Sequence, residues 1–158
     1  ADIDKEMRRI DFIVDGESHF NLNAMRKNLG NTLFKNVGVF RNEASLSSAF
    51  EYIGYLFKRQ YGLHCVNKDR ENNVELSSIV EFKNALYIAE AMTLSALKRQ
   101  ESRGVHYRND FTSKNDKKFS SASYIRLLDD NLFEISFENV VLDDLWHRFK
   151  KYILKIKG

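Results

Sequence analysis

Residues 75–100 read ELSSIVEFKNALYIAEAMTLSALKRQ and carry the longest periodic pattern in the chain. Every third or fourth position holds an apolar or small side chain, which is the spacing of one face of an α-helix. The members of that face are Ile79, Phe82, Leu86, Ala89, Thr93 and Ala96. Because the small residues on this face let neighbouring helices approach closely, the stretch predicts a long helix inside a packed bundle.

Three shorter helices are predicted before this one, each ended by a glycine. The first covers about residues 3–14 and stops at Asp15-Gly16, and the second covers 22–37 and stops before Gly38. The third begins near Asn42 or Ser45, either of which suits an N-cap, and ends at Gly62. The buried stripes are predicted as Ile3, Met7, Ile10 and Val14; then Leu22, Met25, Leu29 and Leu33, extended by Phe34 and Val37; then Leu46, Phe50, Ile53, Leu56 and Phe57. Close packing is expected at Gly30, which lies inside the second helix. Residues 62–74 are polar and aperiodic and predict a loop.

Beyond residue 101 the pattern changes. Residues 123–127 and 132–137 flank a short turn and predict a β-hairpin, and residues 141–157 predict an amphipathic C-terminal helix. The apolar stripe of this last helix suits docking on its own bundle, while its basic face could instead contact an anionic membrane surface or a partner. The predicted fold class is therefore mainly α: a three-to-four-helix bundle, a β-hairpin and a C-terminal helix, in one domain spanning 1–158. The absence of proline agrees with a helical chain.

Composition excludes several classes of function. The 158 residues include 25 basic and 22 acidic side chains, so the net charge of +3 argues against nucleic-acid binding through phosphate neutralisation. Cys65 is the single cysteine, which excludes an intramolecular disulfide and a multi-cysteine zinc site. No apolar run reaches the roughly 18 residues that a membrane-spanning helix needs. A glycine-rich phosphate loop, a zinc-binding histidine pair and a serine nucleophile motif are all missing, so no catalytic, cofactor-binding or metal-binding residue is predicted.

One polar segment is unusual. Residues 96–110 read ALKRQESRGVHYRND and combine several arginines with Glu101 and Asp110 directly after the long helix. Arginine forms planar, bidentate hydrogen bonds to carboxylates and carbonyl oxygens. Two interpretations follow: an ion-pair network that anchors the loop to the bundle, or a site presented to another domain or subunit.

The same segment resembles the hallmark of the C-terminal domain of succinate dehydrogenase, fumarate reductase and L-aspartate oxidase flavoproteins. The matching positions are Ala96, Arg99, Glu101, Ser102, Arg103, Gly104, His106 and Asp110. Residues 25–42 are similar to the family's helix running into V-G-x-x-R, through Val37, Gly38 and Arg41. The long helix is similar to a third family pattern through Asn84, Ala89, Glu90, Ser95, Ala96 and Leu97.

This resemblance implies a helical domain packed against upstream FAD-binding and capping domains of a longer flavoprotein. It implies that FAD and the dicarboxylate bind in those upstream domains, and that this part alone binds no FAD and is inactive. The expected partners are these domains and an iron–sulfur subunit. Association with a membrane is then indirect, at the cytoplasmic or alternatively the periplasmic face. Residues expected to form the polar interface are Arg41, Arg103, His106, Arg108 and Asp110.

The hairpin favours the succinate dehydrogenase and fumarate reductase branch of the family. Two alternatives remain open from the sequence. One is a free-standing helical interaction module that kept the scaffold without the enzyme. The other is the equivalent domain of an L-aspartate oxidase.

Overall fold

The computed structural model describes residues 3–129 and 132–138, which form two compact units, Ala1–Lys114 and Asn115–Gly158. The first unit contains helices α1 (Ile3–Asp15), α2 (Leu22–Asn36), α3 (Glu43–Arg59) and α4 (Val74–Lys98), a 3₁₀ turn (Gln60–Gly62) and the short strands β1 (Phe40–Arg41) and β2 (Tyr107–Arg108). The second unit contains α5 (Asp116–Phe119), β3 (Ala122–Asp129) and β4 (Leu132–Glu138). The mainly α prediction is confirmed. The single domain spanning 1–158 stays a prediction, and the predicted helix at 141–157 lies outside the described residues.

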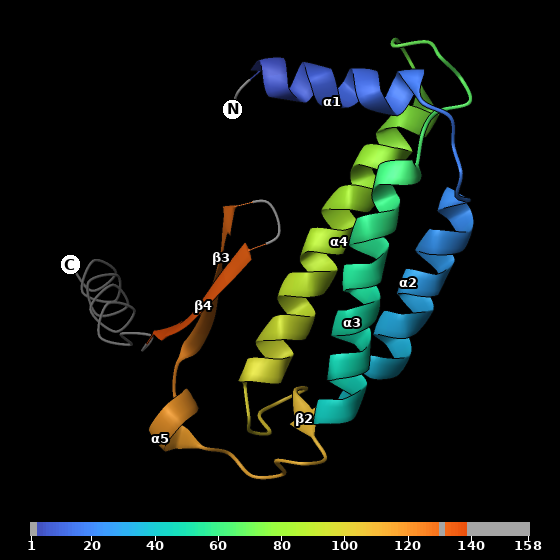
Figure 1. Ribbon diagram of the computed structural model, residues 1–158. Coiled ribbons are helices and arrows are strands. Elements are labelled where there is room, and N and C mark those ends of the chain that lie inside the picture. The colour runs from blue at the N-terminus through green and yellow to red at the C-terminus, as the bar shows by residue number, and fades with distance from the viewer. Residues whose placement is uncertain (1–2, 130–131, 139–158) are drawn as a thin grey trace, which may run out of the picture. The chain divides into compact units, whose positions relative to one another are not determined.

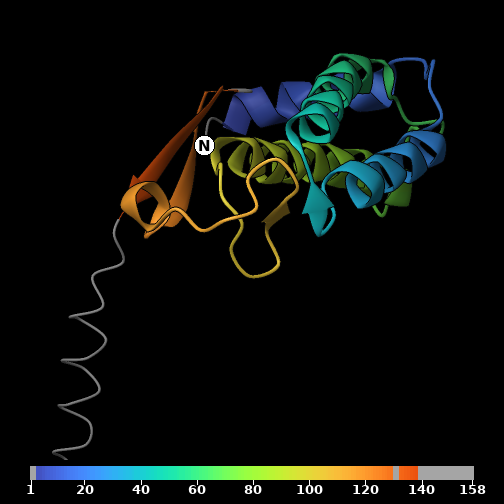
Figure 2. The same ribbon diagram turned by 90° about the horizontal axis from the view of Figure 1, so that it is seen from below.

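Helices α2, α3 and α4 lie side by side and enclose the hydrophobic core, while α1 crosses them near the start of α4 (Figures 1 and 2). All six positions predicted for the buried face of α4 are buried. On α3 the buried set contains Ala49 in place of Phe50, which is only partly buried. Each fully buried apolar side chain of this core stabilises the fold by about 1.5–3 kcal/mol relative to an exposed one.

Asparagine begins three of the four bundle helices. The side-chain oxygens of Asn21, Asn42 and Asn73 each accept a hydrogen bond from a backbone N–H three residues later, at 2.9–3.0 Å. Asn42 is the N-cap of α3, and Ser45 completes a capping box by accepting from the Asn42 backbone N–H. The two candidate N-caps predicted for this helix therefore act together.

Three expectations about the first helices are wrong. Phe34 does not extend the buried stripe of α2 but is 89% exposed, because it follows Leu33 directly and therefore points to another side of the helix, whereas Val37 is buried as predicted. The stripe predicted to be buried on α1 is buried only at Val14, because the first turns of α1 extend away from the bundle (Figure 1); Ile3 is 76% exposed and Met7 51% exposed. Gly30 is not explained by close packing, because a Cβ atom there would have no neighbour within 4 Å. Close packing does explain Gly16, since its Cβ would lie 2.1 Å from Nδ1 of His64.

The second unit confirms the predicted β-hairpin. Strands β3 and β4 are antiparallel with Ile125 opposite Ile135, and the register is irregular between Leu127 and Asp129. Phe119 of α5 packs edge to face against Phe137 of β4, with ring centroids 5.0 Å apart. A two-stranded hairpin is marginally stable by itself, so this aromatic contact helps to hold it.

Candidate functional site: an arginine network

A short parallel strand pair joins the loop after α4 to the connection between α2 and α3. Phe40 of β1 lies opposite Tyr107 of β2, and Arg41 lies opposite Arg108. Tyr107 donates its backbone N–H to the carbonyl of Val39 at 3.2 Å, and Asn109 donates to that of Arg41 at 2.9 Å. This pairing brings two segments that are far apart in the sequence into one site.

Arg108 is the centre of the site, and its side chain has no exposed surface. Its Nε and Nη2 atoms donate to the two carboxylate oxygens of Asp110 at 2.7 and 2.8 Å, and Nη2 also donates to Glu43 at 2.9 Å. Nη1 donates to the carbonyls of Ala96 and Leu97 at 2.9 and 3.3 Å. The five N–H groups of the guanidinium are thereby satisfied. Because these carbonyls end α4 and Glu43 begins α3, Arg108 ties the end of one helix to the start of another.

Asp110 complements Arg108 and contacts α3 directly. Its carboxylate accepts the backbone N–H of Glu43 at 2.7 Å, at the helix N-terminus where a negative charge is favourable. Hydrogen bonding to Arg108, assisted by the Glu43 N–H, lowers the pKa of Asp110 to about 2. The same pair raises the pKa of Arg108 above its ordinary value. Both groups therefore remain charged at neutral pH.

Glu101 is a fully buried carboxylate held between two arginines. It accepts from Nη1 of Arg99 at 2.5 Å and from Nε and Nη2 of Arg103 at 2.8 and 3.0 Å. Arg99 is largely buried, whereas the side chain of Arg103 is 34% exposed. A buried carboxylate needs such partners, because an unpaired charge in this position would be costly.

His106 closes the site through a tight turn. Arg103 and His106 exchange backbone hydrogen bonds at 2.8 and 3.1 Å, and Gly104 supplies the positive φ of 59° that the turn needs. The ring Nε2 lies 3.0 Å from the carbonyl of Arg99, which can only accept, so Nε2 carries the hydrogen and Nδ1 accepts from Nη1 of Arg41 at 3.1 Å. Burial, reinforced by the nearby arginines, lowers the pKa of His106 and favours this neutral ring.

All five residues predicted for the polar interface thus meet in one cluster. The arginine network is defined here as Arg41, Glu43, Arg99, Glu101, Arg103, His106, Arg108 and Asp110. Glu43 was not predicted, because its position at the start of a separate helix gives no sequence signal for pairing with Arg108. The hydrogen bonds and ion pairs described above are those expected of a network that anchors the loop after α4 to the bundle. An interface role for the five residues stays a prediction.

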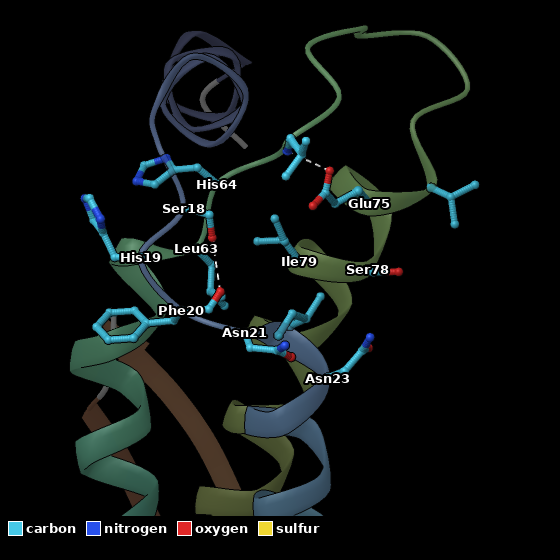
Figure 3. Close-up of a pocket in the computed structure, with 13 residues that line it drawn as sticks. Ser18, His19, Phe20, Asn21, Asn23, Leu63, His64, Glu75, Ser78 and Ile79 are labelled. Atoms are coloured by element: carbon cyan, nitrogen blue, oxygen red, sulfur yellow. Dashed lines mark hydrogen bonds between the residues drawn. The ribbon is translucent and has the colours of Figure 1, made fainter.

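A separate pocket of about 770 Å³ lies where the α1–α2 connection meets α4 and residues 63–66 (Figure 3). His64 and Glu75 both line it but are engaged elsewhere. His64 donates from Nδ1 to the carbonyl of Phe12 at 2.8 Å, and Glu75 accepts from the backbone N–H groups of Val66 and Asn67 at 2.7 and 3.1 Å. Over residues 3–129 and 132–138, no group of three or more histidine, cysteine or acidic residues has the arrangement of a metal site. The same residues include no helix long and apolar enough to cross a membrane.

Comparison with known proteins agrees with the hallmark pattern. Residues 26–153 match the family model described as fumarate reductase flavoprotein C-term. The chain belongs to this family of flavoprotein C-terminal domains. It is 29% identical over 149 residues to the flavoprotein subunit of 8-methylmenaquinol:fumarate reductase of Wolinella succinogenes, covering 94% of this chain and 24% of that protein. It is also 29% identical over 116 residues to the succinate dehydrogenase flavoprotein subunit of Bacillus subtilis, covering 73% of this chain and 20% of that protein.

Solved structures of this flavoprotein family share the fold. A variant of E. coli quinol fumarate reductase superposes with a TM-score of 0.79 at 22% identity, covering 85% of this chain and 23% of that one. The Mycobacterium smegmatis Sdh1 complex in its apo form gives a TM-score of 0.77 at 21% identity, covering 88% and 24%. The chain therefore spans about a quarter of the length of these proteins and corresponds to the C-terminal domain of a succinate dehydrogenase or fumarate reductase flavoprotein.

Proposed function

We propose that this chain is the assembly-supporting C-terminal domain of an FAD-dependent subunit that interconverts succinate and fumarate. FAD and the dicarboxylate bind in upstream domains of the parent chain. An iron–sulfur subunit accepts or supplies the electrons, and the parent complex associates with the cytoplasmic face of a membrane through other subunits. The residues described here contribute by holding a surface in place rather than by contacting the reacting atoms.

The observation that carries this proposal is a set of exposed apolar side chains on segments next to the polar network. They are Phe34 near the end of α2, Val39 and Phe40 at β1, and Val105 in the turn before β2, with exposed fractions of 89%, 50%, 69% and 78%. The strand pair places Phe40 opposite Tyr107, two residues after Val105. Contiguous exposed apolar side chains are typical of a binding surface, and we propose that these four residues, named the apolar rim, act as one.

The arginine network fixes the segments that carry the rim. Arg41 and His106 join β1 to the turn at 103–106. Arg108 and Asp110 join β2 and the residues after it to the start of α3, and Arg108 also joins them to the end of α4. Arg103 lies two residues before Val105 and its side chain is 34% exposed, so it could also contact another domain directly. Each of the five predicted residues thus either supports the rim or borders it.

The test uses the full-length flavoprotein and the substitution Val105→Asp. Placing a carboxylate in a buried apolar contact loses the burial of one valine, about 1.5 kcal/mol, and adds desolvation of the charge. We expect the purified variant to release FAD at a lower temperature and to retain less iron–sulfur subunit than the unchanged protein.

Val74→Asp is the matched control. Val74 is also 78% exposed but is the first residue of α4, away from the rim, where an acidic side chain suits the helix dipole. FAD release and subunit retention should be unchanged in this control. Equal retention in Val105→Asp and the unchanged protein would reject the rim as an assembly surface.

A further inference from the structure

A second cavity lies between α1, the 3₁₀ turn and α4. It has a volume of about 390 Å³, within the range of small-molecule sites. Apolar side chains and four cations line it. The apolar residues are Phe12, Ile13, Leu63, Ile79 and Val80, and the cations are Lys5, Arg8, Arg9 and Lys83.

The charge of this cavity is of one sign. No aspartate or glutamate is among the residues that line it. Arg9 lies 3.0 Å from Glu6 on the same helix, and that carboxylate does not face the cavity. Within the described ranges 3–129 and 132–138, neither Arg8 nor Lys83 forms an ion pair. Lys83 lies over the ring of Tyr87, 5.7 Å from its centroid, but no carboxylate of the described residues neutralises it. Arg8 and Lys83, in a cavity also lined by apolar side chains, therefore create a site that favours an anion.

The wall of the cavity also contains an unsatisfied hydrogen-bond donor. Gln60 lines the cavity and is only 9% exposed, and its side-chain Nε2 has no hydrogen-bond partner among the residues that the structure describes. A buried amide without a partner costs about 1–3 kcal/mol, so an acceptor brought by a ligand would be favourable there.

We propose that this cavity binds a monocarboxylate with an apolar chain, such as a medium-chain fatty acid. The apolar chain packs on Phe12, Ile79 and Val80. The carboxylate lies between Arg8 and Lys83 and accepts from Gln60. This site is separate from the arginine network and the apolar rim, and it does not depend on the function proposed for them.

Decanoate, titrated into the ¹⁵N-labelled 158-residue chain below its micellar concentration, tests this site by NMR. We expect saturable shifts centred on the Gln60 side-chain amide and on α1. Acetate lacks the apolar chain and decylammonium has the opposite charge, so neither should reproduce these shifts. The double variant Arg8→Gln, Lys83→Gln should bind about tenfold more weakly, because each exposed ion pair contributes up to about 1 kcal/mol.

Lys27→Gln is the control for loss of charge, because Lys27 is exposed on α2 and does not line the cavity. Val80→Trp fills the cavity and should abolish the NMR shifts that decanoate causes. If this variant does not fold, the comparison of the double variant with Lys27→Gln tests the site instead. Equal binding of decylammonium, or unchanged affinity in the double variant, would overturn the proposal. It would also be overturned if the chain sedimented with phosphatidylglycerol vesicles but did not bind free decanoate.

Discussion

Replacement of Arg108 by methionine tests whether the arginine network stabilises the bundle. The change keeps an unbranched side chain in a fully buried position but removes five hydrogen bonds. The carbonyls of Ala96 and Leu97 each lose a partner, which costs about 1 kcal/mol apiece. The ion pairs to Asp110 and Glu43 contribute about 1 kcal/mol together, since these carboxylates are 29% and 61% exposed and stay hydrated after the change.

The expected loss is therefore about 3 kcal/mol, measured as the free energy of unfolding in urea by circular dichroism. For a chain of this size it corresponds to a fall in Tm of about 6–12 °C. Arg108→Lys should restore less than half of the loss, because one ammonium cannot reach two carbonyls and two carboxylates at once.

Arg26→Met is the control, since Arg26 forms a surface ion pair with Glu81 at 3.1 Å and the two side chains are 40% and 66% exposed. This variant should lose less than about 1 kcal/mol. If Arg108→Met were no more destabilising than Arg26→Met, the arginine network would not stabilise the bundle. Likewise, if lysine at position 108 matched arginine, the guanidinium would not be what stabilises the bundle.

Two further predictions concern charged groups with specific partners. The pKa of Asp110 is lowered from 3.8 to about 2 in the folded chain, so its contribution to stability is complete above about pH 4 and is lost as the pH falls through 2. We expect this loss to be about 1 kcal/mol after allowance for partial exposure, and to be absent from Asp110→Asn, as measured by urea unfolding at pH 5 and pH 2. Lys68 donates from Nζ to the carbonyls of Val14, Gly16 and Cys65 at 2.6–2.7 Å, so Lys68→Met should cost about 1–2 kcal/mol and speed hydrogen exchange at the end of α1. Equal exchange in the unchanged chain and in Lys68→Met would contradict the second prediction.

The helices of the bundle could be predicted because their signals are local. Periodicity placed all six buried residues of α4, and the glycines at 16, 38 and 62 marked helix ends within three residues. The predicted burial of the α1 stripe was wrong because burial depends on which elements surround the helix. The stripe on α1 has the correct spacing for burial, but a pattern does not show whether a neighbour is present to cover Ile3 and Met7.

The strand pair between β1 and β2 could not be predicted in the same way. Each strand has two residues, which is too short to show alternation, and the pairing joins the α2–α3 connection to the loop after α4. Glu43 likewise reads as an ordinary acidic residue in the first turn of a helix. Its pairing with Arg108 depends on that long-range strand pair, and local spacing carries no information about it.

Residues 96–110 combine two roles, which are to anchor the loop to the bundle and to present exposed apolar side chains. Arg99, Glu101, Arg108 and Asp110 match or adjoin the family pattern, and the hydrogen bonds described for them are made inside this chain. Within this chain, these bonds are enough to account for the four residues by the packing of the bundle. Val105 and Phe40 are different, because they are exposed apolar residues held rigidly by those bonds. If the family's C-terminal domains assemble through this end of the bundle, partner specificity will follow the apolar rim. Substitutions of Arg99, Glu101, Arg108 and Asp110 will then act on assembly only by shifting the position of the rim.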